Sequence, residues 1–212
     1  MRGLALTGAA LLGSALLVSP EPAQAAWQYF SCASDNFAAQ FPDVPKMETV
    51  KFTMPRHKDA LSARSYTTTV DNVVYKMLVA DYSDRIPFGA SILEEALFQH
   101  TEADDHGLRN GKIIGNDTAR IEPVGRGATY GRRITMDYPN DQGRNLTTFY
   151  FRDGKLYEMS VEITPASGDY GTPTATRFVE SLVFNLARLN ETEGKLPPNI
   201  QGCGTNIQEF KS

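Results

Sequence analysis

Residues 73–82 are apolar on both faces of a predicted strand, and this constrains the fold more than any other stretch of the chain. Successive side chains of a strand point to opposite sides of a sheet. Both sets are apolar here: Val73, Tyr75, Met77 and Val79 on one side, and Val74, Leu78, Ala80 and Tyr82 on the other. Such a strand is predicted in the middle of a sheet whose two faces are both covered.

Turn signals place this strand among antiparallel neighbours. Asp71-Asn72 is a two-residue hairpin signal between predicted strands at 64–70 and 73–82. Asp153-Gly154 is the strongest hairpin signal in the chain and joins strands at 145–152 and 155–164. The remaining strands are predicted at 37–42, 46–54, 113–122 and 128–138.

Two helices are predicted around these strands. Ser91 and Glu94 form a capping box that opens an amphipathic helix ending near residue 101. Thr172 supplies an N-cap before Pro173, at the start of a helix predicted to run to about Leu189. Alternating groups of strands and helices describe an α+β domain with a mainly antiparallel sheet and helices packed on it.

Residues 1–25 have the pattern of a cleavable secretory signal. Arg2 precedes an apolar run at 4–18, and small residues stand before a cut after Ala25. A run of about 15 residues is too short to cross a bilayer, which takes about 20. We therefore predict that residues 26–212 form one periplasmic or secreted domain, with no membrane span after processing.

Cys32 and Cys203 are the only two cysteines. In an oxidising compartment an isolated pair typically forms a disulfide, which would pin the C-terminal tail to the start of the domain. A redox-active pair is the alternative, although catalytic dithiols are usually close in sequence, as in Cys-x-x-Cys.

The order of elements resembles the PsbP-like α/β/α sandwich superfamily and its exported bacterial members. The matching sequences are NFAAQFPDVP at 36–45, GRRI at 131–134, FYFRDGKLY at 149–157 and RFVESL at 177–182. The resemblance covers about residues 35–188. It implies a fold whose characterised members act mainly as binding or assembly accessories, with no catalytic set to transfer. We expect a protein partner in the export compartment and no cofactor.

Exposed salt links beside a turn that enters a strand are the leading interpretation of four arginines near two glycine-containing segments, and a surface for an anion or a partner is the alternative: Arg120, Arg126, Arg132 and Arg133. The glycine spacing is not the dinucleotide fingerprint, and the following segment is predicted to be a strand and not a helix. A net charge of −4 gives no broad electrostatic reason to bind nucleic acid or an anionic membrane.

A metal site is a further hypothesis, because five ligand-type residues lie within seven positions: His100, Glu102, Asp104, Asp105 and His106. Their spacing is not the i, i+4 pair of a two-histidine helix motif, and a solvated acidic loop is the alternative. A metal-binding module using His100, Asp104 and His106 therefore stays open as one function.

Catalytic patterns are sparse. There is no Gly-x-Ser-x-Gly elbow, and Ser91 is better explained as the helix cap. Neighbouring carboxylates such as Glu94 and Glu95 point in different directions on a helix and so do not form a facing acid and base. The leading hypothesis is a soluble, non-enzymatic binding or accessory protein, and a small secreted hydrolase with a dispersed site is the alternative.

Overall fold

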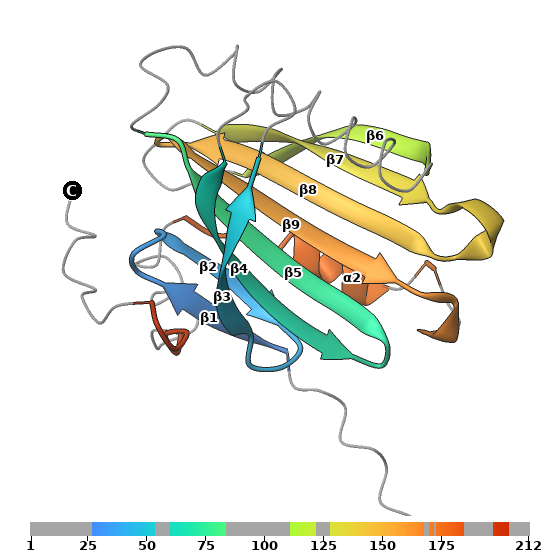
Figure 1. The fold of residues 1–212 in the computed structure, drawn as a ribbon, viewed down its shortest axis with the longest axis horizontal. Coiled ribbons are helices and arrows are strands. Elements are labelled where there is room, and N and C mark those ends of the chain that lie inside the picture. The colour runs from blue at the N-terminus through green and yellow to red at the C-terminus, as the bar shows by residue number, and fades with distance from the viewer. Residues whose placement is uncertain are drawn as a thin grey trace, which may run out of the picture.

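A seven-stranded antiparallel sheet dominates the computed structural model (Figure 1). The structure describes residues 27–53, 60–83, 111–121, 128–167, 170–171, 173–184 and 197–203. The elements are β1 (Gln28–Cys32), β2 (Phe37–Phe41), β3 (Lys46–Phe52), β4 (Leu61–Val70), β5 (Val73–Asp81), β6 (Lys112–Ile121), β7 (Thr129–Asp137), β8 (Arg144–Arg152), β9 (Lys155–Ile163) and α2 (Pro173–Val179), with short 3-10 turns at Pro139–Asp141 and Pro165–Ser167. The predicted signal at 1–25 and the predicted helix at 91–101 lie outside the described residues.

Both predicted hairpin turns are confirmed. Asp71 and Asn72 have φ values of 52° and 61°, and Asp153 and Gly154 have φ values of 51° and 80°. Positive φ at both central residues is what a two-residue type I′ turn requires, and its twist matches that of the flanking strands. These turns fix the register of β4 with β5 and of β8 with β9.

The strand order across the large sheet is β3-β4-β5-β9-β8-β7-β6. The predicted interior position of the strand at 73–82 is confirmed, because β5 lies between β4 and β9. The pairing of β5 with β9 is antiparallel and joins the two halves of the chain. The hairpin of β6 and β7 extends the sheet beyond β8, which leaves β6 and β3 as its edges.

Apolar side chains are buried on both faces of the sheet. The cluster on one face includes Tyr66, Tyr75 and Met159 and packs against α2 and the β1–β2 hairpin. A second cluster on the opposite face includes Leu78, Ile134 and Phe149. The two-sided coverage predicted from residues 73–82 therefore agrees with the burial of this sheet.

Gly131 of β7 lies where this strand comes close to β8. A β-carbon at this position would collide with the carbonyl oxygen of Phe149 and with the ring of Tyr150 on the neighbouring β8 strand. The close approach of β7 to β8 therefore requires glycine here.

The closing helix is shorter than predicted. Pro173 is its first residue, as expected, but α2 ends at Val179 and does not continue to Leu189. The hydroxyl of Ser181 donates to the carbonyl oxygen of Phe178 at 2.7 Å, and Val183 exchanges two main-chain hydrogen bonds of 2.8 Å with Ala38 of β2. Pairing with β2 thus replaces helical hydrogen bonds after the first two turns.

Segments from both ends of the domain combine in a small second sheet. β1 and β2 form an antiparallel hairpin, and β1 was not predicted from the sequence. Ser31 of β1 accepts from the Ile200 N–H at 2.9 Å and donates its own N–H to Pro198 at 2.9 Å. The C-terminal segment at 197–203 therefore lies along β1, while Val183 lies along β2.

The α+β prediction is confirmed for the mainly antiparallel sheet and for a helix packed on it. Within the described ranges α2 is the one α-helix, so this part of the chain is richer in β-structure than predicted. No helix in those ranges is long and apolar enough to cross a membrane.

Candidate functional site

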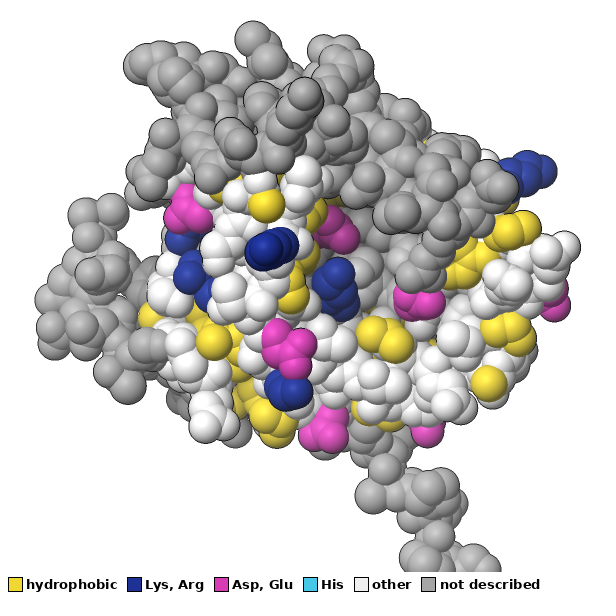
Figure 2. All heavy atoms as spheres, viewed as in Figure 1, with side chains coloured by type: hydrophobic (Ala, Val, Ile, Leu, Met, Phe, Trp, Pro, Cys, Tyr) yellow, Lys and Arg dark blue, Asp and Glu magenta, His cyan; other side chains and the backbone are white. Residues whose placement is uncertain are grey.

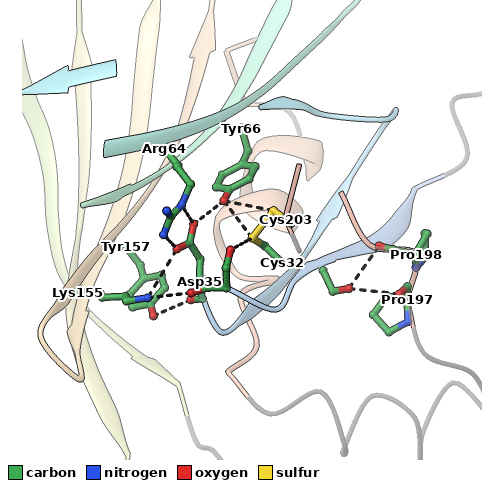
Figure 3. The surroundings of a disulfide bond; sticks show 11 residues. Cys32, Asp35, Arg64, Tyr66, Lys155, Tyr157, Pro197, Pro198 and Cys203 are labelled. Carbon is green, nitrogen blue, oxygen red and sulfur yellow. Dashed lines mark hydrogen bonds and ion pairs between the residues drawn. A yellow bond between two sulfur atoms is a disulfide. The ribbon is translucent and has the colours of Figure 1, made fainter. Parts of the chain in front are cut away.

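A buried carboxylate, Asp35, occupies the turn between β1 and β2 (Figure 3). Arg64 of β4 binds this carboxylate through two guanidinium nitrogens. Its Nε donates to Oδ2 at 2.5 Å, and its Nη2 donates to Oδ1. The Tyr66 hydroxyl, two residues along the same strand, also donates to Oδ2 at 2.5 Å. Charged hydrogen-bond partners offset the cost of burying such a group.

The β9 strand holds the same turn from its other side. Lys155 places its Nζ 3.7 Å from Asp35 Oδ1 and donates to the main-chain oxygen of Ser34 at 3.0 Å. The Tyr157 hydroxyl donates to the main-chain oxygen of Asp35 at 2.8 Å. Burial lowers the pKa of Lys155, and the positive charge of Arg64 lowers it further, while Asp81 acts in the opposite direction.

The predicted disulfide between Cys32 and Cys203 is present, and both residues are fully buried. The Tyr66 oxygen lies 3.1 Å from the sulfur of Cys32 and 3.5 Å from that of Cys203. One hydroxyl therefore touches both the disulfide and the Asp35 carboxylate (Figure 3). We call Asp35, Arg64, Tyr66, Lys155 and Tyr157 the Asp35 cluster.

The Asp35 cluster links the β1–β2 turn to strands β4 and β9 of the large sheet. Its carboxylate is fully buried and both oxygens are already engaged by side chains of β4 and β9. A general acid or base must be within hydrogen-bond reach of its substrate, and Asp35 presents no open side to one. The cluster instead fastens the β1–β2 turn to the large sheet beside the disulfide.

Buried tyrosines make the fold sensitive to alkali, and Tyr150 gives a clean test. Burial raises the pKa of Tyr150 to about 12, whereas an unfolded tyrosine has a pKa of about 10. Between these values the unfolded chain loses a proton that the folded chain keeps, so stability falls as pH rises. Tyr150→Phe should reduce this fall by about 1.4 kcal/mol per pH unit in urea unfolding at pH 10–12. An identical slope in wild type and variant would contradict this prediction.

The structure divides the predicted arginine group between the two faces of the sheet. Arg133 lies on the α2 face, where it pairs with Glu180 at 2.8 Å. Arg132 lies on the opposite face and donates to the side-chain oxygen of Asn116. Adjacent residues of β7 point to opposite sides, so Arg132 and Arg133 cannot belong to one patch, and the predicted surface for an anion or a partner stays a prediction. Arg126 lies outside the described residues.

Arg120 and Arg132 do share a face. Arg120 is opposite Tyr130 in the β6–β7 ladder, and Thr118 is opposite Arg132. The guanidinium carbon of Arg120 lies 5.7 Å from the centre of the Tyr130 ring, within the range of a cation–π contact. We call the residues on this face the outer-strand patch: Asn116, Thr118, Arg120, Tyr130 and Arg132.

The predicted metal ligands His100, Asp104 and His106 all lie outside the described residues. The same is true of His57, the remaining histidine, and of Ser91. Among the residues that the structure does describe, no group of three or more His, Cys, Asp or Glu side chains could hold a metal ion.

The Asp35 cluster was not predicted from the sequence, although the sequence contains part of the pattern that forms it. Arg64 and Tyr66 are two residues apart on a predicted strand, so they were bound to share a face. Asp35 follows Cys32 closely and precedes Asn36, a pairing typical of turns. No local pattern, however, indicates that this turn meets β4 and β9.

Comparisons with known proteins give a likeness of fold. No protein-family model and no curated protein matches the sequence. Among solved structures, the chain is similar to cyanobacterial PsbP (CyanoP) from Synechocystis sp. PCC 6803, at 14% identity and a TM-score of 0.48. The match covers 81% of this chain and 98% of that one. The matched structure is a PsbP, the kind of protein that the predicted resemblance names.

Proposed function

We propose that this is an exported, non-enzymatic binding or accessory protein that docks a protein partner through the outer-strand patch. The observation that carries the proposal is the exposure of Tyr130, which is 52% accessible although Arg120 lies over its ring. Tyrosine and arginine are enriched at protein interfaces and among the residues that dominate binding energy. An exposed aromatic ring with a neighbouring cation offers such a partner both apolar area and charge.

The cations of the patch are positioned in advance. Arg132 is half-buried and is held by the side chain of Asn116, while Arg120 rests over Tyr130. Side chains ordered before binding lose less conformational entropy when a partner arrives. This arrangement supports a surface that recognises a carboxylate-bearing partner, because the guanidinium fork matches carboxylate geometry.

The charge distribution supports local recognition over broad electrostatic attraction. Figure 2 shows Lys or Arg side chains interspersed with Asp or Glu side chains on the face in view. The formal net charge of the chain is −4. A mixed surface produces no large field of one sign, so the partner must be selected by contacts within the patch.

Export and the finer architecture belong to the same proposal. The signal pattern at 1–25 and the buried disulfide support an oxidising compartment outside the cytoplasm. The apolar cluster of Leu78, Ile134 and Phe149 supports helices on both faces of the sheet, as in an α/β/α sandwich, because such a cluster needs a covering layer.

Tyr130→Ser tests the proposed surface. Affinity purification from the exported fraction should recover a partner with the wild-type protein, and Tyr130→Ser should reduce that recovery about tenfold, as loss of an interface tyrosine does. Val44→Ser is the matched control, because Val44 is 64% exposed in the turn after β2, away from the patch. Equal recovery with wild type and Tyr130→Ser would contradict the proposal.

A further inference from the structure

The outer edge of the large sheet adds a second recognition element beside the outer-strand patch. β6 is ten residues long and is paired on one side with β7, while no described strand pairs with its other side. Unpaired strand edges present main-chain N–H and C=O groups that can pair with another chain. Natural proteins usually block such edges, so an edge that no described strand covers calls for a physical explanation.

The first part of β6 contains a feature that hinders pairing with another strand, and the second part does not. The register with β7 shifts between Ile113 and Gly115, which marks a bulge. Bulges twist an edge away from flat pairing. From Asn116 to Ile121 the register is regular, and the side chains of Asn116, Asp117, Thr118 and Arg120 are exposed.

On the face of the outer-strand patch, the opposite edge differs in its charge. β3 carries Lys46 and Glu48 side chains that pair with each other at 2.7 Å, both largely exposed. A neutral internal pair of this kind gives no preference for the charge of an incoming strand. On the regular part of β6, the patch face instead carries Arg120, with Arg132 of β7 next to it on the same face. Asp117 of β6 and Lys51 of β3 lie on the other face.

We propose that residues 116–121 of β6 bind an extended acidic segment of a partner protein by strand addition. This inference rests on the proposed function and specifies the chemistry of its partner. The added strand would place its side chains alternately on the two faces of the sheet. Carboxylates on one face would meet Thr118 and Arg120, and apolar side chains on the other would extend the surface of Ala119 and Ile121.

The probe is an eight-residue peptide of alternating Glu and Val with blocked ends. Its controls are the Lys-Val counterpart and a peptide with the same Glu and Val residues arranged in two blocks. Fluorescence anisotropy should show binding of the alternating acidic peptide, while both controls bind at least about tenfold more weakly. Hydrogen exchange should show slowed amide exchange within residues 116–121 when that peptide is present.

Arg120→Glu should weaken binding of the acidic peptide by at least about tenfold, because it sets like charges opposite each other. Lys51→Glu is the matched control, since Lys51 is an exposed cation on the other edge strand and its reversal should leave binding unchanged. An unchanged circular dichroism spectrum and melting temperature verify that each variant is folded.

Three results would overturn strand addition: no binding of the alternating acidic peptide, equal binding of a control peptide, or protection that falls outside residues 116–121. If Tyr130→Ser still reduces partner recovery in any of these cases, the docking surface stands and the strand-addition mode fails. If partner recovery is also unaffected, the proposed function fails with it.

Discussion

Asp35→Asn is expected to lower the free energy of unfolding by about 3 kcal/mol. Removing one member of a buried ion pair costs roughly 3–5 kcal/mol because the remaining charge is left uncompensated. We expect the lower end of that range, because the Arg64 side chain is 36% exposed and can still reach solvent. Lys155 also loses its charged neighbour, and the amide has one accepting oxygen where the carboxylate has two, so Arg64 and Tyr66 cannot keep all three of their hydrogen bonds.

The matched control is Asp137→Asn. Asp137 also accepts from an arginine, Arg144 Nε at 2.6 Å, but 37% of its side chain is exposed. Exposed pairs contribute about 0–1 kcal/mol, so urea unfolding should place this variant close to wild type. Equal effects of the two substitutions would show that burial of Asp35 does not govern stability.

Loss of the disulfide is expected to destabilise the domain by up to about 5 kcal/mol. The bond joins residues 171 positions apart, and cross-linking a loop of this length removes much conformational entropy from the unfolded chain. The value is an upper figure because residual structure in the unfolded chain reduces it. Once the disulfide is lost, residues 197–203 are held to β1 mainly by the hydrogen bonds of Ser31 and the burial of Ile200.

The double substitution Cys32→Ala with Cys203→Ala and chemical reduction of the wild type should give similar unfolding midpoints. The double variant should not respond to reductant, which controls for effects of the reagent itself. Hydrogen exchange should report opening of residues 197–203 before the large sheet opens. A change of under 1 kcal/mol on reduction would contradict the role given to this bond.

The parts of the fold that the sequence predicted are those specified by neighbouring residues. Asp71-Asn72 and Asp153-Gly154 define their hairpins because few residue pairs accept positive φ at both positions. Pro173 marks the start of α2 for a similar reason, since its fixed φ suits the first turn of a helix. The interior position of β5 followed from its two apolar faces.

The parts that could not be predicted depend on contacts between distant residues. Nothing local to Val183 indicates that it would pair with Ala38 and so end the helix early. The Asp35 cluster likewise needs β1, β4 and β9 to meet, and the pairing of β5 with β9 is not encoded in either strand alone. The arginine group is a different case, because alternation along β7 already separates Arg132 from Arg133.

Site-specific photocrosslinking at position 130 tests the central claim most directly. Tyr130 is replaced by the photoreactive residue p-benzoylphenylalanine in the full chain, and the same replacement at Val44 serves as the control because that side chain is even more exposed. Irradiation of the exported fraction should give one adduct of defined mass from position 130 and none from position 44. No adduct at position 130, or the same adducts from both positions, would contradict the account that the outer-strand patch is where this protein meets its partner.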